Sequence, residues 1–439
     1  MEGDAAVLIR RIYTALWWAA LPLLPVRLWW RGRREPGYRA HVAERFGRYA
    51  PRPQGEVVWV HAVSLGETRA AAPLVQRILD ERPQATVLLT HMTATGRESG
   101  AQWRTPRVVQ AWLPYDVPFA VERFLSHFQP RAGLLMETEV WPNLLAAARR
   151  RAIPVYLVNA RLSERSARRY ARVAQFSRAT FADLAGVAAQ GPDDAQRLRA
   201  LGARDVVVTG SIKFDLDVPA GTREAGARLR ARIGDGRPVL VAASTREGEE
   251  AQLLDALAAA PAALPDRTVL VIVPRHPQRF DAVAELLDAR GIPYVRRTAG
   301  PDALPAGTAV VLGDSMGELL AYYAAADVAF VGGSLLPLGG QNPIEPLAVA
   351  VPTLVGPHTF NFADVTAEAI AAGAAVRVSD ATDMLQAAGR LLRDPAARQV
   401  MRERAETFVA AHRGATDRLW AWLGAAMTAP GPSDAARPP

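Results

Sequence analysis

The chain has 439 residues, half of them hydrophobic, which is enough for two domains of ordinary size. It contains no cysteine, and this excludes disulfides, thiolate metal sites and a cysteine nucleophile. The formal net charge of +8 is concentrated locally, because residues 27–52 hold eight arginines against two glutamates. Beside an apolar run, such a basic segment fits an anionic membrane surface better than nucleic acid, so we expect no nucleic-acid partner.

The first expected element is a membrane-associated segment over residues 1–34. Residues 12–26 form an uncharged apolar run with two adjacent tryptophans and two prolines. The run is shorter than the ~20 residues that a spanning helix needs. We therefore expect an interfacial helix, with tryptophan at the headgroup level and the arginines of residues 31–34 on an anionic leaflet. The alternatives are a buried core helix and a signal peptide.

Short apolar strands alternate with helical segments through residues 35–218. This alternation predicts a parallel sheet that is covered by helices on both faces, as in a Rossmann-like domain. The strands are expected over residues 57–63, 86–90, 108–113, 133–136, 155–158, 185–189 and 206–209.

A stretch rich in Gly, Arg and Ala, residues 219–236, is expected to connect this domain to a second one over residues 237–405. The second domain shows the same alternation. Its strands are expected over residues 239–243, 269–273, 309–312, 328–331, 353–355 and 375–378. Two doubly wound halves would place ligands at the carboxyl ends of their strands, in a cleft between them. The Pro- and Ala-rich residues 430–439 are expected to be a disordered tail.

The stretch from Gly332 to Pro346 carries the strongest ligand-binding pattern. It follows an expected strand, and its glycines let backbone N–H groups approach a ligand closely. Asn342 and Pro343 predict the start of a helix, whose N-terminus suits a phosphate. Glu345 lies one turn further, where its carboxylate can accept from ribose hydroxyls. The pattern favours a sugar-nucleotide site, and the alternative is an ordinary glycine-rich loop before a capped helix.

Residues 61–68 follow the first expected strand and allow two interpretations. Ser64 and Glu67 have the spacing of a capping box, in which both side chains satisfy the backbone at the start of a helix. Alternatively, Glu67 is a general base at the mouth of the cleft. A helix N-terminus keeps a carboxylate ionised, whereas burial raises its affinity for a proton. The spacing alone leaves both open.

Two further residues of the first half are candidates for chemistry. Glu137 follows a strand directly, and its alternative role is to stabilise the N-terminal end of the next helix. Lys213 could neutralise phosphate or carboxylate charge, and the alternative is a solvated lysine. Asp215 and Asp217 match an acid-x-acid metal pattern, but that pattern is very common, and we interpret the match as a coincidence.

Two loops of the second half are candidates for anion binding. Pro274 and Arg275 end a strand, and an arginine held between prolines can stack on a base or bind phosphate. The loop with Met316, Gly317 and Glu318 leads into another helix and is a second candidate anion nest. Because these loops follow strands of one domain, together they indicate an anion site more strongly than one loop alone does.

Five motifs together resemble the 3-deoxy-D-manno-octulosonic acid (Kdo) transferases of lipid A assembly. They run in order along nearly the whole chain: HAVSLGE at 61–67, METEVWPN at 136–143, GSIKFD at 210–215, PRHP at 274–277 and GGQNPIEP at 339–346. The resemblance implies a GT-B fold, with two Rossmann-like domains that face a central cleft. It places the acceptor in residues 35–218 and CMP-Kdo in residues 237–405. Residues 406–429 would hold a C-terminal helix, near residues 402–423, that returns to the first domain.

The same resemblance implies the reaction. Kdo would move from CMP-Kdo to a lipid A precursor of the lipid IVA type, with inversion and without metal or other cofactor, at the cytoplasmic side of the inner membrane. Glu67 would be the base, and Glu137 and Lys213 would stabilise the transition state. Ser64 and Gly66 would lie on the acceptor side. The residues that would hold CMP are Pro274, Arg275, Met316, Gly317, Glu318, Asn342, Pro343, Ile344 and Glu345.

Arg246 and Gln341 depart from the family pattern, because histidine is expected at both positions in several relatives. These departures concern donor contacts rather than the reaction. An alternative function is that of another GT-B enzyme, such as a sugar-nucleotide epimerase or a UDP-sugar transferase. A membrane-bound nucleotide-binding protein without catalysis is a third, but it would not need Glu67 and Glu137 together.

Overall fold

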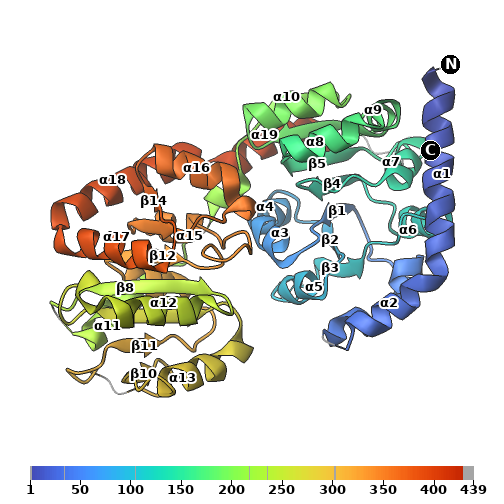
Figure 1. Cartoon of the computed structure of the whole chain (residues 1–439). Coiled ribbons are helices and arrows are strands. Elements are labelled where there is room, and N and C mark those ends of the chain that lie inside the picture. Colours follow the sequence, from blue (N-terminus) through green and yellow to red (C-terminus); the bar gives the residue numbers. More distant parts are fainter. Residues whose placement is uncertain are drawn as a thin grey trace. The chain divides into compact units, whose positions relative to one another are not determined.

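The computed structural model describes the backbone of residues 2–33, 35–103, 105–216, 218–234, 236–300 and 303–428 and, within these, the side chains of residues 6–424. The chain divides into two compact units (Figure 1). Unit 1 runs to Asp215 and takes up the chain again from Arg413, and unit 2 runs from Leu216 to His412. Each unit contains one seven-stranded sheet, so the expected two-domain α/β fold is confirmed.

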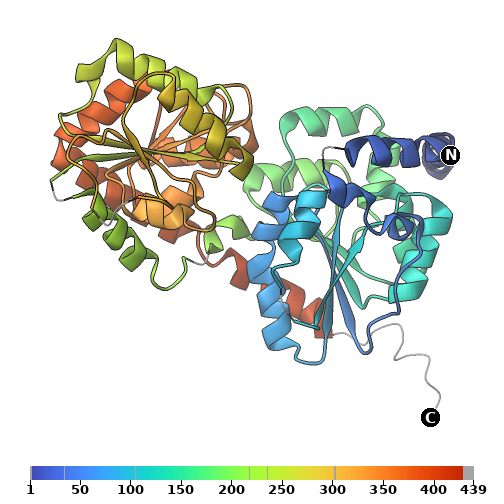
Figure 2. The same ribbon diagram turned by 90° about the horizontal axis from the view of Figure 1, so that it is seen from below.

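The N-terminal segment is helical from its first described residue. It consists of α1 (Glu2–Ala20), a 3-10 turn at Pro22 (Leu21–Leu23) and α2 (Leu24–Arg31), and α1 lies alongside unit 1 (Figures 1 and 2). The helix thus begins well before the apolar run at residues 12–26. By length and composition, residues 6–31 could cross a membrane, and only 6% of the apolar window is buried. Arg34 lies outside the described residues.

The sheet of unit 1 is entirely parallel and has the strand order β3-β2-β1-β4-β5-β6-β7. Its strands are β1 (Val57–His61), β2 (Thr86–His91), β3 (Val108–Trp112), β4 (Ala132–Met136), β5 (Val155–Ala160), β6 (Gly186–Ala189) and β7 (Val206–Val208). The chain moves outward from β1 in both directions, so the order reverses between β1 and β4. That reversal is the position where doubly wound sheets bind ligands.

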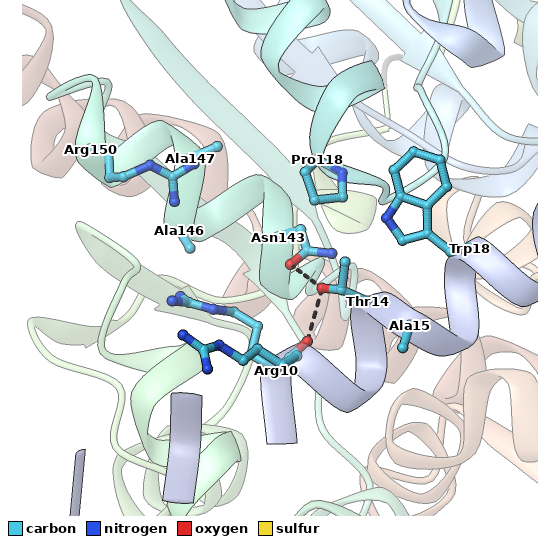
Figure 3. A pocket seen from close by; sticks show the side chains of 10 residues that line it. Arg10, Thr14, Ala15, Trp18, Pro118, Asn143, Ala146, Ala147 and Arg150 are labelled. Carbon is cyan, nitrogen blue, oxygen red and sulfur yellow. Dashed lines mark hydrogen bonds between the residues drawn. The ribbon is translucent and has the colours of Figure 1, made fainter. Parts of the chain in front are cut away.

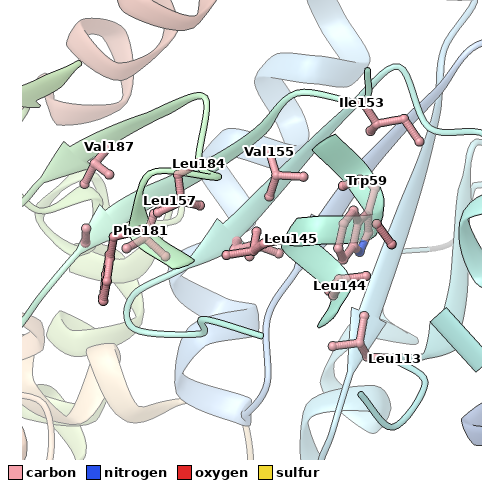
Figure 4. Close-up of a cluster of buried hydrophobic side chains, with 14 of the residues drawn as sticks. Trp59, Leu113, Leu144, Leu145, Ile153, Val155, Leu157, Phe181, Leu184 and Val187 are labelled. Atoms are coloured by element: carbon pink, nitrogen blue, oxygen red, sulfur yellow. The ribbon is translucent and has the colours of Figure 1, made fainter. Parts of the chain in front are cut away.

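Helices cover both faces of this sheet, as the apolar strands require. They are α3 (Leu65–Ala70), α4 (Ala72–Glu81), α5 (Ala94–Gly100), α6 (Pro118–Phe128), α7 (Pro142–Arg150), α8 (Glu164–Ala171), α9 (Ala174–Phe181), α10 (Pro192–Ala200) and α19 (Ala415–Thr428). Short 3-10 turns span Pro36–Arg39, Val42–Phe46 and Ile212–Asp215. On one face, Trp59, Leu145 and Phe181 belong to a single buried cluster (Figure 4). On the other, Leu419 and Leu423 of α19 pack with α4.

Unit 2 repeats this plan with the parallel order β10-β11-β9-β8-β12-β13-β14. Its strands are β8 (Val239–Thr245), β9 (Val269–Pro274), β10 (Tyr294–Arg296), β11 (Val310–Leu312), β12 (Val328–Val331), β13 (Thr353–Val355) and β14 (Ala375–Arg377). Its helices are α11 (Thr222–Ile233), α12 (Glu249–Ala259), α13 (Phe280–Asp288), α14 (Leu319–Ala324), α15 (Ile344–Ala348), α16 (Ala363–Ala371), α17 (Ala381–Arg393) and α18 (Pro395–His412). The strand order here reverses between β8 and β12.

Two expected segments differ from the structure. Residues 219–236 hold α11, which packs against α14 with Leu229 and Ile233 buried, so they belong to unit 2 rather than to a linker. The helix expected near residues 402–423 is divided into α18 and α19 at Gly414, whose φ is +80°. A polar Gly-Ala-Arg composition cannot distinguish a connector from an amphipathic helix, because the apolar partner lies far along the chain. The tail at 430–439 lies outside the described residues.

Candidate functional site

The carboxyl end of β1 forms the capping box that the sequence suggested. Ser64 Oγ accepts from the Glu67 backbone N–H at 3.4 Å and donates to Glu67 Oε1 at 3.2 Å. Glu67 Oε2 accepts from the backbone N–H of Val63 at 2.7 Å. These contacts hold the Glu67 carboxyl group in one orientation at the ligand edge of the sheet, beside Gly66 on the exposed first turn of α3.

The same carboxyl group has the proton affinity of a base that works near neutral pH. Burial, and then the negative charge of Glu137, raise the pKa of Glu67 to about 8, although its contacts with Val63 and Ser64 act in the opposite direction. The cap and the base are therefore compatible. The capping contacts position the carboxyl group, and its surroundings make it more basic.

Glu137 lies directly after β4, which is paired with β1. Its φ of +59° is a left-handed conformation that a residue with a Cβ adopts only at a cost. Its Oε1 lies 2.6 Å from Lys213 Nζ, and Lys213 belongs to the 3-10 turn after β7. The fold thus brings Glu67, Glu137 and Lys213 together from three separate motifs, at the reversal between β1 and β4.

Two residues that the sequence did not single out support this cluster. Asn159 in β5 is buried with φ +51°, and its Oδ1 accepts from the Ile212 backbone N–H at 3.1 Å, next to Lys213. Burial and the charge of Glu137 raise the pKa of Glu139 as well, against its contact with Trp141. The polar Asn159 inside an otherwise apolar strand was the signal that could have found it.

Two other polar residues of these motifs have structural roles. His61 is fully buried, its Nδ1 contacts Thr90, and burial lowers its pKa to about 3, so it stays neutral. The Asp215 carboxylate accepts from the backbone N–H groups of Gly414 and Thr416 and so caps the start of α19. Asp217, the other acid of that pattern, lies outside the described residues.

In unit 2, one buried carboxylate organises the glycine-rich loop after β12. Glu249, with 0% exposure, accepts from the backbone N–H groups of Gly333, Ser334 and Leu335 at 2.5–2.9 Å and from that of Arg246 at 2.9 Å. It therefore joins the loops that follow β8 and β12, the two strands at the reversal. Sequence patterns cannot assign this role to Glu249, because its partners in the loop after β12 lie about 85 residues away.

Backbone geometry at this edge requires glycine. A Cβ on Gly332 would lie 2.6 Å from Thr245 Cα, and Gly333 has φ +69°. Ser244, at the end of β8, is also left-handed, with φ +58°. Close backbone approach and strain thus concentrate where the order of the strands reverses, which is typical of ligand sites.

The candidate donor residues surround this loop. Pro274 ends β9, and Arg275 Nε donates to Gln341 Oε1 at 3.1 Å, which links the two predicted motifs directly. Asn342 Oδ1 accepts from the Ile344 backbone N–H at 3.1 Å, but Asn342 lies one residue before the N-cap of α15 and is not the cap itself. Pro343 occupies the N-cap position instead of the first helical position, and Glu345 lies in the first turn.

The third loop is more open. Met316 is 64% exposed, Gly317 has φ +80°, and Glu318 pairs with Arg297 at 3.1 Å. The helices that start at these loops, α14 and α15, have only six and five residues. Their dipoles are correspondingly short.

The chain is similar to known proteins along most of its length. Residues 40–216 match the family model described as 3-deoxy-D-manno-octulosonic-acid transferase (kdotransferase). The chain is 49% identical to the 3-deoxy-D-manno-octulosonic acid transferase of Bordetella pertussis, over 94% of this chain and 100% of that one. It is 37% identical to the enzyme of the same name from Haemophilus influenzae, over 93% and 97%.

The fold also resembles solved structures. The UDP-GlcNAc 2-epimerase from Neisseria meningitidis, bound to UDP-GlcNAc, matches with a TM-score of 0.57 at 16% identity, over 84% of this chain and 100% of that one. At this identity the likeness concerns the fold alone. The two units are therefore the two Rossmann-like domains of a GT-B chain.

Proposed function

The chain belongs to the family of 3-deoxy-D-manno-octulosonic acid transferases, and on that premise we propose that it moves Kdo from CMP-Kdo to a lipid A precursor of the lipid IVA type. It is a glycosyltransferase, a Kdo transferase. The observation that supports the detailed proposal is the cluster of Glu67, Glu137 and Lys213 at the strand reversal of unit 1, with Glu67 made basic by its surroundings.

In this proposal the acceptor hydroxyl is activated at the edge of unit 1. Its oxygen attacks the ketosidic carbon of Kdo, while the bond from that carbon to the phosphate oxygen of CMP breaks. The hydroxyl proton passes to Glu67, and the bonding electron pair leaves with CMP. A single displacement of this kind inverts the configuration, and it needs one carboxylate base rather than the pair of carboxyl groups that glycosidases use.

Charge development explains the other two residues. A ketosidic carbon that loses its leaving group acquires oxocarbenium-like positive charge, which the Glu137 carboxylate can stabilise. Lys213 balances Glu137 and can face the carboxylate of Kdo. The phosphate of CMP is already ionised at pH 7, so it needs charge stabilisation more than a proton. Arg275 and the N-termini of α14 and α15 are proposed to supply it in unit 2, and no metal is required for this scheme. The N–H groups of Gly333, Ser334 and Leu335 are already bound by Glu249.

The N-terminal segment is proposed to hold the enzyme on the cytoplasmic side of the inner membrane, lying on the bilayer rather than crossing it. Tyr13 donates to Asp116 at 3.0 Å and Thr14 donates to Asn143 at 3.0 Å, so one face of α1 is hydrogen-bonded to the body of unit 1. Apolar side chains on the rest of the segment are exposed, with Leu16 at 65% and Trp30 at 60%. Such an amphipathic arrangement fits the membrane interface.

The donor is tested by thermal shift. We expect CMP to stabilise the protein more than UMP or UDP at equal concentration, because ligand binding raises stability by RT ln(1 + [L]/Kd). Equal stabilisation by UDP would contradict a CMP-sugar donor.

The reaction is tested by incubating CMP-Kdo with the lipid IVA-type precursor in the presence and absence of EDTA. We expect unchanged transfer with EDTA and an inverted ketosidic linkage by NMR. Retention of configuration would rule out the single displacement at Glu67.

A further inference from the structure

A pocket of about 430 Å³ lies between α1 and α7, away from the residues assigned above to catalysis (Figure 3). From α7 it is lined by Asn143, Ala146, Ala147 and Arg150, which are spaced to share one helix face. The small alanine side chains leave the space that the pocket occupies. Opposite them, α1 contributes Arg10, Arg11, Thr14 and Trp18.

Hydrogen bonds hold the two helices in this arrangement. Thr14 Oγ1 donates to Asn143 Oδ1, and Tyr13 donates to Asp116, which in turn accepts from the backbone N–H groups of Asn143 and Leu144 at 2.9 and 2.8 Å. Asp116 is buried, so this network is shielded from water. The pocket is therefore built by fixed contacts, and α1 is not free to move its arginines away independently.

The residues that line the pocket carry an excess of positive charge, because three of them are arginines and none is acidic. Arg10 and Arg11 have no acidic partner among the described side chains, whereas Arg150 donates to Glu122 at 2.7 Å, a carboxylate that Arg151 also binds. Among the described side chains, Glu122 is therefore the one carboxylate that pairs with a pocket arginine, and Arg151 shares it. Figure 3 shows Arg10 and Arg150 reaching from the two helices toward the same side of the pocket.

This chemistry suits a phosphate group. Guanidinium groups bind phosphate oxygens through paired, charge-assisted hydrogen bonds, and they are preferred at phosphate sites. Trp18 lies at the rim, half exposed, and Leu8, Ile12 and Leu16 continue an outward apolar stripe at a spacing of four residues. A phosphate attached to a lipid would place its head in the pocket and its acyl chains along this stripe.

We propose that the pocket between α1 and α7 binds the phosphate of a membrane lipid headgroup. Such a site anchors α1 at a fixed depth in the interface. It is separate from the arginine-rich residues 27–52. The phosphate belongs either to a bilayer phospholipid or, if the proposed function holds, to the phosphorylated glycolipid acceptor.

The test uses the full-length protein and vesicles of phosphatidylcholine with or without phosphatidylglycerol. Each basic residue near an anionic surface contributes roughly a fivefold factor in affinity, so R10Q/R11Q should weaken binding to the anionic vesicles by roughly tenfold or more. Binding to pure phosphatidylcholine should be unchanged. The matched control, R223Q/R228Q, removes two exposed arginines of α11 and should change binding much less.

A second variant and two further measurements decide the remaining alternatives. R150Q acts from α7 and leaves Glu122 paired with Arg151, so it should weaken anionic binding without unfolding the protein, as circular dichroism checks. The proposal is overturned by an equal loss of vesicle binding in R223Q/R228Q, or if neither pocket variant loses vesicle binding. It is also overturned if inorganic phosphate abolishes vesicle binding completely, because the lipid would then not matter. A raised KM for detergent-solubilised acceptor with unchanged kcat assigns the phosphate to the acceptor, and a vesicle effect alone assigns it to the bilayer.

Discussion

The ligand edges of the two units have the same topology but different chemistry. In unit 1, the edge between β1 and β4 gathers ionisable side chains, and two of its carboxyl groups have raised pKa values. In unit 2, the edge between β8 and β12 consists mainly of backbone groups. Its buried acid, Glu249, accepts hydrogen bonds from four backbone N–H groups. In our proposal, the first edge accepts the proton and the second holds the phosphate of the donor.

The difference comes from the loops rather than from the sheets. Both strand orders reverse in the same way, so both edges are ligand positions. In unit 1 the loop after β1 is short, and its helix begins at once, with Ser64 as the N-cap and Glu67 in the first turn. In unit 2 the loop after β12 is long and rich in glycine, and its shape depends on an acid from another loop. The two units therefore share a fold but have different sites, because their loops differ.

The largest expected effect comes from removing the base in unit 1. E67Q keeps the shape and one capping contact but cannot accept a proton, so we expect transfer to fall by on the order of 10²-fold or more, with little change in CMP affinity. Steady-state kinetics and a CMP thermal shift measure the two. E98Q, at an exposed position of α5, is the control, and near-normal transfer by E67Q would reduce Glu67 to a helix cap.

E67Q should also change stability with a definite sign. The folded pKa of Glu67, about 8, lies above its ordinary value of 4.5, so its contribution to stability is present below pH 4.5 and is lost as the pH rises toward 8. The stability of E67Q relative to the wild type should therefore be higher at pH 8–9 than at pH 5. Melting curves of both proteins across this range measure the crossover.

The next effect removes the organising acid of unit 2. E249A leaves three buried backbone N–H groups and one partly buried group without their acceptor, and we expect a loss of about 2 kcal/mol or more in the stability of unit 2, together with weaker CMP binding. Chemical denaturation measures the loss. E247Q is the matched control, because Glu247 is 84% exposed and its carboxylate comes no closer than 3.8 Å to Arg279. Equal losses in both variants would contradict the assigned role of Glu249.

A smaller effect tests whether the carboxyl groups of Glu67 and Glu137 interact. E137Q removes the negative charge that raises the pKa of Glu67, so that pKa should fall and the rising limb of kcat/KM should move to lower pH by roughly one unit. The wild-type limb is expected near pH 8, because the base must be deprotonated to act. An unmoved limb in E137Q, with Glu67 still essential, would show that the two groups do not interact.

The smallest effect tests how far the edge of unit 2 depends on side chains. Q341L removes the acceptor for Arg275 Nε but leaves the backbone loop in place, so CMP affinity should fall by roughly fivefold or less, the worth of about 1 kcal/mol. Isothermal titration measures it. A loss as large as that of E249A would mean that side chains, rather than backbone, hold the anion.

The strands were predictable because apolar runs of β-branched residues between helices have few other solutions. Residues 328–331 and 353–355 match β12 and β13 to the residue. The short edge strand β10 was missed, since its sequence Tyr-Val-Arg is half polar and carries no period. The connection expected at residues 219–236 was wrong for a related reason, because the apolar side of α11 is visible only against α14.

The sequence by itself determined the two doubly wound sheets, the capping box at Ser64 and Glu67, and the set of loops that follow the strands, because these depend on local patterns. Only the tertiary structure decided which of those loops meet. The pairing of Lys213 with Glu137 and the binding of the loop after β12 by Glu249 join residues about 75 and 85 positions apart. The basic pocket joins α1 to α7 across 129 positions. No local preference encodes such contacts, since they depend on how helices and strands pack.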